Sequence, residues 1–142
     1  MKALLSLILL LSISACKHKE DKDGPFGNWQ IQKDQFTRIT GTARPPDKPH
    51  MLAFNRNKNI LKKIENKYPP SEYKYEWIKG VYGTEDIDRY KSTRKSTVDV
   101  SGFETQVLLV TKIADKTDPF YFDIMYICPP PTGTCDLTDN SD

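Results

Sequence analysis

Two apolar runs near the C-terminus decide the fold of this chain: Gln106-Val107-Leu108-Leu109-Val110-Thr111-Lys112-Ile113 and, after five residues and a proline, Phe120-Tyr121-Phe122-Asp123-Ile124-Met125-Tyr126-Ile127-Cys128. The middle of the first run is apolar at every position, which is typical of a strand buried on both faces. The second run is rich in the aromatic and β-branched residues that strands favour. Two such runs, separated by a polar turn, predict a β-hairpin at the centre of the domain.

A third strand is predicted from Glu72 to Tyr82, where Tyr73, Tyr75 and Trp77 recur at every second position. An aromatic face of this kind usually packs into the core under a helix, and we adopt that interpretation. If the face were exposed, it would instead be a binding surface with aromatic anchors.

One helix is predicted with a clear pattern, from Asn59 to Lys67. Ile60, Leu61 and Ile64 recur at helical spacing, while lysines occupy the other face. An asparagine can cap its start, and the Tyr68-Pro69 step ends it because a residue before proline avoids the α region.

Four segments carry weaker patterns. Gly27 to Thr42 predicts one or two short strands, and Met51 to Phe54 is compatible with another. Residues 41–49 contain three prolines, which predict an exposed loop. Gly83 to Ser96 is mainly polar and predicts a long loop.

Together these segments predict an α+β fold, in which an antiparallel sheet of about five or six strands carries one packed helix. An all-β sandwich or small barrel is the alternative. The mature chain has the length of one ordinary domain, and all fifteen aromatic residues lie in it, so a core can form despite the high charge.

The N-terminus carries a different pattern. Lys2 precedes an apolar run, residues 3–11, that is too short to span a membrane, and Ile13-Ser14-Ala15-Cys16 follows it. These four residues resemble the lipobox of bacterial lipoproteins, in which an aliphatic residue and two small ones precede the cysteine that receives lipid. The alternative is an ordinary secretory peptide with a chance cysteine.

The resemblance implies cleavage before Cys16 and acylation of that cysteine, and several acyl chains hold a protein firmly on a bilayer. Lys17 stands where an aspartate commonly retains lipoproteins at the inner membrane. We therefore expect an outer-membrane anchor with the domain on the periplasmic face. The predicted organisation is a signal peptide over residues 1–15, a flexible tether over 16–27, one globular domain over 28–135 and an acidic tail over 136–142.

Two further cysteines, Cys128 and Cys135, remain in the mature chain. In an oxidising envelope compartment we expect them to form a disulfide bond that closes a small loop. Two thiols without further ligands close by in the sequence do not make a structural zinc site. We therefore predict no metal and no cofactor.

The charge balance argues against nucleic acid as a partner, because the mature chain has twenty basic and nineteen acidic residues. Its distribution is uneven: residues 38–95 carry fourteen basic against seven acidic residues, and residues 96–142 carry two against eight. Such an asymmetry can steer a partner. We favour the simpler interpretation, in which the two regions pair in the sheet and their charges interleave.

No motif for nucleophilic catalysis, phosphate binding or dinucleotide binding is present, and neither histidine lies beside a nucleophile in any motif. Glu85, Asp86 and Asp88 are acidic neighbours, but the ligand spacing of a calcium loop is absent. We therefore predict no catalytic residues. A small hydrolase that uses carboxylates in this segment is the enzymatic alternative, since the separation of such a pair is spatial.

These observations predict a lipid-anchored envelope module that binds another protein, of the inhibitor or immunity type. An accessory lipoprotein of a secretion or conjugation assembly is the alternative binding function. Loops carry variable binding chemistry, so we expect partner contacts in the polar segment, and to a lesser degree in residues 44–50. The candidate contact residues are Arg89, Lys91, Arg94 and Lys95.

We expect Cys16→Ala to abolish the incorporation of labelled palmitate and to leave the protein unprocessed or poorly anchored, because the lipid is its predicted hold on the bilayer. The measurement is metabolic labelling followed by membrane fractionation. Palmitate incorporation equal to that of the unmodified protein would contradict the lipoprotein interpretation.

Overall fold

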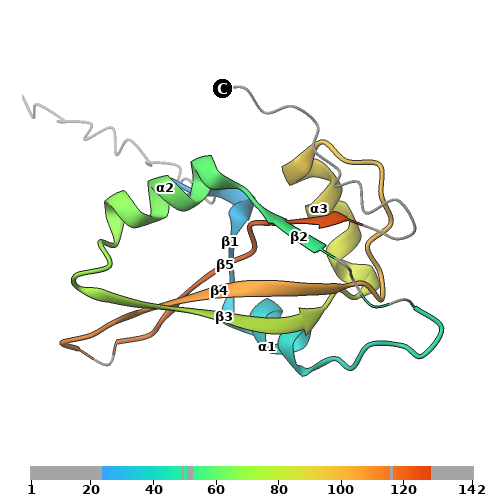
Figure 1. Ribbon diagram of the computed structural model, residues 1–142, viewed down its shortest axis with the longest axis horizontal. Coiled ribbons are helices and arrows are strands. Elements are labelled where there is room, and N and C mark those ends of the chain that lie inside the picture. The colour runs from blue at the N-terminus through green and yellow to red at the C-terminus, as the bar shows by residue number, and fades with distance from the viewer. Residues whose placement is uncertain (1–23, 49, 51–52, 116, 129–142) are drawn as a thin grey trace, which may run out of the picture.

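The computed structural model describes residues 24–128, apart from residues 49, 51–52 and 116 (Figure 1). The predicted signal peptide, most of the tether and the acidic tail lie outside the described residues. Strands and helices follow one another as β1 (Gln30–Ile31), α1 (Lys33–Gly41), β2 (Ala53–Arg56), α2 (Lys58–Lys67), β3 (Tyr73–Val81), α3 (Ile87–Arg94), β4 (Glu104–Lys112), β5 (Phe120–Phe122) and β6 (Met125–Cys128), with 3-10 turns η1 (Gly27–Trp29) and η2 (Thr84–Asp86).

The predicted α+β class is confirmed. Four antiparallel strands form one sheet in the order β1-β5-β4-β3, and β2 pairs with β6 in a second, two-stranded sheet. The longest pairing joins β3 to β4 over nine residue pairs, with Trp77 opposite Leu108. As predicted, the middle of β4 is buried on both faces, since Val107, Leu108 and Val110 are all fully buried.

One face of the four-stranded sheet packs under α2, as the sequence pattern predicted. Asn57 caps the helix by accepting a hydrogen bond from the backbone N–H of Ile60 at 3.0 Å. The aromatic face of β3 belongs to this layer, so its interpretation as core is confirmed. The layer consists of Phe26, Ile64, Tyr68, Leu108, Val110, Phe122 and Ile124, with Tyr73, Tyr75 and Trp77 packed against it.

Helix α1 packs against the other face of the sheet (Figure 1), and Tyr90 of α3 joins the same core cluster. Helix α1 lies very close to β3, because Gly80 leaves no side chain between them. A Cβ atom on Gly80 would lie 2.6 Å from Ile39 Cγ2 and 2.7 Å from the Ile39 carbonyl oxygen. The absence of a side chain at Gly80 therefore sets the distance between helix and sheet.

The prediction of one helix was incomplete, because two further helices form. The segment Gly27 to Thr42 was predicted as strands, but only β1 is extended, and α1 follows it. Gln32 and Gln35 bracket its first turn with a reciprocal capping box, and Phe36 and Ile39 are one helical turn apart. Gly83 to Ser96 was predicted as a loop but forms η2 and α3, whose buried face carries Tyr90 and Arg94.

The predicted hairpin is correct only in its first part. Strand β5 pairs with β4 from Phe120 to Phe122, and the chain then leaves the sheet at Asp123. Strand β6 continues instead beside β2. Cys128 is buried at its end, whereas Cys135 lies outside the described residues, so the disulfide remains a prediction.

The packed domain begins earlier than predicted. Phe26, which the sequence assigned to the tether, is buried and packs edge-on against Phe122. Among the described residues, none of the helices is both long enough and apolar enough to cross a bilayer.

We expect Gly80→Ala to lower the free energy of unfolding by about 1–3 kcal/mol, because the new methyl group collides with the backbone of α1. Gly41→Ala is the matched control, since a Cβ there meets no atom within 4 Å. Urea denaturation measures both. Equal stability of the two variants would show that helix and sheet can separate without cost.

Candidate functional site

The residues that we predicted to contact a partner lie on or just after α3, and two of them are buried. Arg94 is fully buried and Arg89 is largely so, whereas Lys91 is half-buried and Lys95 is exposed. The prediction that all four side chains form an exposed charged loop is therefore wrong. A helix presents them to different environments, and the two arginines face the interior.

Arg94 ties α3 to the segment between β5 and β6. Its guanidinium donates to the Asp123 carboxylate at 2.8 Å, to the Asp123 carbonyl at 2.9 Å and to the Met125 carbonyl at 2.7 Å. The same group lies over the rings of Trp29 and Tyr90, at 4.7 and 4.2 Å from their centroids. Arg94 thus fills a core position with a charge that is hydrogen-bonded and stacked.

Asp123 is the acidic centre of this cluster. The Tyr82 hydroxyl donates at 2.6 Å to Oδ1, the oxygen that Arg94 also contacts, and Oδ2 forms an ion pair with Arg89 at 2.7 Å. Burial alone would raise the pKa of Asp123, but Arg94 and Arg89 together outweigh burial and lower it. Burial, followed by the Asp123 charge, raises the pKa of Tyr82 well above its ordinary value. Asp123 is therefore held as the carboxylate and Tyr82 as the phenol.

Asp86 continues the cluster to α1. It is fully buried and accepts two hydrogen bonds from Arg38, at 2.6 and 3.1 Å, and one from the Gly83 backbone N–H at 2.8 Å. Arg89 lies 3.4 Å from it. Asp86, a candidate carboxylate in both the hydrolase and the calcium hypotheses, is thus already paired with basic groups of its own chain. Within the described part of the chain, no group of three or more His, Cys, Asp or Glu side chains could hold a metal ion.

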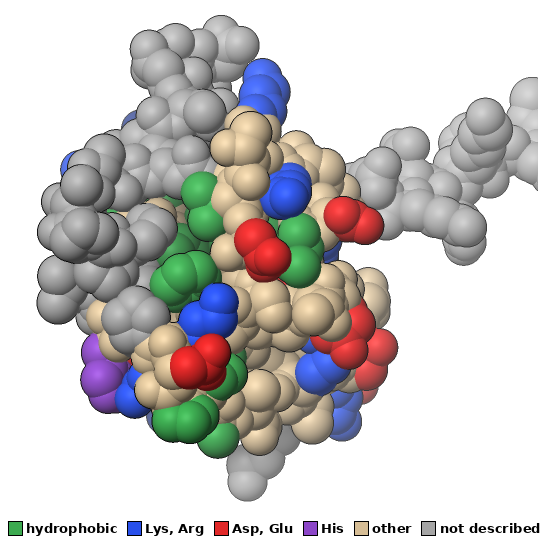
Figure 2. Space-filling view, turned by 90° about the vertical axis from the view of Figure 1, so that its right-hand side faces the viewer, with side chains coloured by type: hydrophobic (Ala, Val, Ile, Leu, Met, Phe, Trp, Pro, Cys, Tyr) green, Lys and Arg blue, Asp and Glu red, His purple; other side chains and the backbone are tan. Residues whose placement is uncertain are grey.

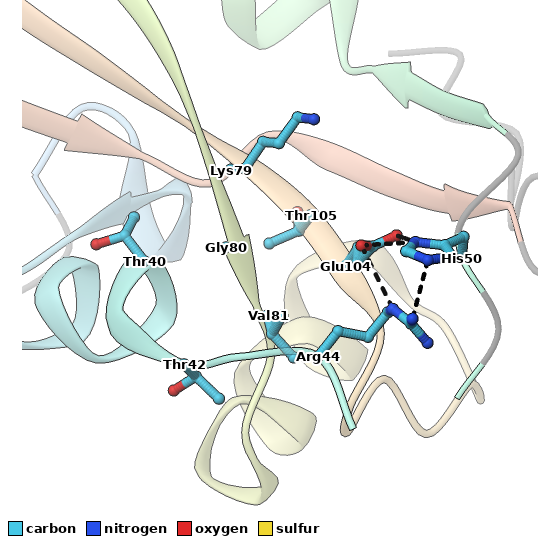
Figure 3. A pocket seen from close by; sticks show the side chains of 9 residues that line it. All are labelled: Thr40, Thr42, Arg44, His50, Lys79, Gly80, Val81, Glu104 and Thr105. Atoms are coloured by element: carbon cyan, nitrogen blue, oxygen red, sulfur yellow. Dashed lines mark hydrogen bonds and ion pairs between the residues drawn. The ribbon is translucent and has the colours of Figure 1, made fainter. Parts of the chain in front are cut away.

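A cavity with a volume of about 510 Å³ lies elsewhere, at the C-terminal half of β3 (Figure 3). This is within the range of about 300–1,000 Å³ typical of ligand sites. The end of α1 bounds it on one side, and the loop that follows bounds it on the other. We call it the β3 groove; its lining residues are Thr40, Thr42, Arg44, His50, Lys79, Gly80, Val81, Glu104 and Thr105.

Three charged or titratable side chains form a chain along one wall of the β3 groove (Figure 3). His50 Nδ1 lies 3.1 Å from Glu104 Oε1, and Arg44 donates to His50 Nε2 at 2.9 Å. Arg44 also donates to the carbonyl of Lys48. A guanidinium can only donate, so Nε2 is the acceptor and the proton of the neutral ring is on Nδ1. The lone pair that a general base would use is already occupied by Arg44.

The β3 groove also exposes backbone, because β3 is the edge strand of its sheet. The even-numbered residues of β3 exchange hydrogen bonds with β4, as the flanking bond from the Tyr82 N–H to the Phe103 carbonyl shows. The N–H and C=O groups of Trp77 and Lys79 therefore point away from the sheet. Neither residue forms a backbone hydrogen bond on that side with any described residue.

Only part of the β3 groove was predicted from the sequence. Residues 44–50 were predicted as a secondary contact loop, and the groove includes Arg44 and His50 from it. Glu104 was not predicted, because 54 positions separate it from His50 and no motif links them. The end of the molecule viewed in Figure 2 shows acidic and basic side chains interspersed, in keeping with the interleaving of charges that we favoured.

No family model, no curated protein and no solved structure matches this chain.

We expect Asp123→Asn to lower the free energy of unfolding by about 3–5 kcal/mol, because it removes the carboxylate charge that pairs with both Arg89 and Arg94 in the interior. Asp88→Asn is the control, because Asp88 is exposed on α3, the helix that carries both arginines. It should change the free energy of unfolding by less than about 0.5 kcal/mol. Chemical denaturation measures both.

The pH dependence gives a second test of the same cluster. The folded-state pKa of Asp123 is depressed, so its stabilising contribution is present above the unfolded pKa and is lost as pH falls through the folded pKa. The difference in stability between the unmodified protein and Asp123→Asn should therefore be constant near neutral pH and shrink in acid. A difference independent of pH would show that the carboxylate charge is not what stabilises the fold.

Proposed function

We propose that this protein is a lipid-anchored envelope module that binds an extended segment of another protein in the β3 groove. The observation that carries the proposal is that the edge strand β3 supplies Lys79, Gly80 and Val81 to the lining of this cavity, and that the backbone groups on its open side make no bond to β4. An extended chain can add to such an edge through main-chain hydrogen bonds and gain specificity from the flanking side chains.

The flanking side chains suit a polar partner. Thr40 and Thr42 offer hydroxyl groups on one wall, and the Arg44–His50–Glu104 chain offers both charges on the other (Figure 3). Lys79 is exposed and forms no ion pair with any described residue, so it is available to an acidic group of the partner. Charges at the rim govern the encounter rate and the choice of partner more than the affinity.

The lipid anchor remains part of this proposal and rests on the lipobox resemblance at Cys16. An inhibitor, an immunity protein and an accessory subunit of an envelope assembly would all use such a groove, so we propose the binding mode for all three. We assign no catalytic role to Asp86 or to His50, because Arg38 and Arg89 engage the first and Arg44 engages the second.

The test introduces proline at the open edge. Lys79→Pro removes a backbone N–H that makes no bond to β4, so the fold should tolerate it, whereas a strand added to the edge would lose a donor. Lys79→Ala is the matched control, which removes the charge but keeps the N–H. Both variants are made in protein that carries a benzophenone amino acid at Thr42, in the groove wall, and is photolysed in cells.

We expect one discrete protein adduct from the unmodified background and from Lys79→Ala, and loss of that adduct in Lys79→Pro. Circular dichroism of each variant checks the fold. A benzophenone at Asp88, on α3 and outside the groove lining, is the positional control and should not give the adduct. An adduct that persists in folded Lys79→Pro would show that the partner does not add to β3.

A further inference from the structure

We infer that the exposed face of α2 lies against the anionic phospholipid surface of the membrane that holds the protein, so that the β3 groove points away from it. This inference rests on the lipid anchor of the proposed function. Three observations carry it: the charge of the helix face, the place where the chain enters the domain, and the short length of chain between that place and Cys16.

The solvent-facing side of α2 is basic. Lys58, Lys62, Lys63 and Lys67 are all exposed on this helix, and Glu65 is its one acidic residue. The spacing of Lys58 and Lys62 by four residues places their charges side by side, where they repel one another. Lys58, Lys62 and Lys63 form no ion pair with any described residue. The face therefore carries uncompensated positive charge suited to a polyanionic surface.

The chain enters the domain beside the end of this helix. Phe26 is buried against Tyr68, with ring centroids 6.1 Å apart, and the Lys67 ammonium lies 5.6 Å from the Phe26 ring centroid. Tyr68 directly follows α2. The segment that comes from the lipidated cysteine is thus fixed to the C-terminal end of the basic face.

The length of that segment keeps the helix near the bilayer. Phe26 stands ten positions after Cys16. Whatever its conformation, a chain of ten residues spans at most about 35 Å. Charges at this distance reach within a Debye length of about 8–10 Å of the surface during ordinary motion. The anchor thus supplies proximity, and the lysines supply orientation.

The same orientation directs the groove away from the membrane. Figure 1 shows α2 on one side of the four-stranded sheet and α1, whose end borders the β3 groove, on the other. Strand β3 starts after α2 and runs to the β3 groove, and its nine residues span about 26 Å. A partner could therefore reach the groove without displacing the basic face.

The experiment uses the full lipidated protein in vesicles of phosphatidylcholine, alone or mixed equally with phosphatidylglycerol. A fluorescent amino acid replaces Asn66, which is exposed on α2, or Asp88 on α3, and energy transfer to a headgroup-labelled lipid reports which end faces the bilayer. The charge-reversed pair Lys62→Glu and Lys63→Glu is compared with Lys33→Glu and Lys95→Glu, which change the net charge equally at exposed positions away from α2.

We expect phosphatidylglycerol to increase energy transfer from position 66 and not from position 88. The increase should disappear in the Lys62/Lys63 pair, remain in the Lys33/Lys95 pair and vanish in about 1 M salt, where the Debye length is about 3 Å. Equal loss in both pairs, or no increase from position 66, would overturn the inference and leave an acidic protein surface as the match for α2. Co-sedimentation of the protein with the vesicles tests the lipid anchor separately, and photo-crosslinking in the groove tests the proposed binding function. A failure of either can therefore be distinguished from a failure of the orientation inferred here.

Discussion

The contact between Arg94 and Asp123 is the interaction on which the rest of this structure depends. It joins α3, at one end of the molecule, to the point where the chain passes from the four-stranded sheet into the two-stranded one. Arg89, Asp86 and Arg38 extend it to α1, so three helical segments and both sheets meet around a few charges. Charges removed from water are costly unless paired, and pairing therefore fixes where each of these elements can lie.

The charged residues of this cluster stabilise the fold, and a different set of polar residues lines the β3 groove. The acidic groups of the cluster are engaged by arginine, tyrosine and backbone donors, so they hold the fold and leave the polar chemistry of the surface to other residues. The β3 groove lies where α1 crosses the sheet at Gly80, and the cluster positions that helix through Arg38. The interior charges thus shape the groove without lining it.

Periodic segments were predictable from the sequence, and segments held by charge were not. The apolar runs of β4 and β5, the alternation of β3 and the lysine and apolar faces of α2 follow from side-chain patterns alone. Helix α3 escaped prediction because one of its buried positions is Arg94, which a pattern of apolar residues cannot reveal. The departure of the chain at Asp123 depends on arginines about thirty positions away. The groove likewise joins His50 to Glu104, whose meeting only the folded sheet creates.

The split of the C-terminal apolar run between two sheets has a consequence for how the chain matures. Strand β5 links β1 to β4, and β6 is the partner of β2. Neither β1 nor β2 can therefore pair until β5 and β6 have been synthesised. Until then only the β3–β4 pair can form, because every other strand pairing in the described residues needs β5 or β6. A nascent chain therefore cannot complete its core before β6 has emerged. A polypeptide threaded through a translocation channel would benefit from this delay, since it would stay unfolded during passage and fold on the far side.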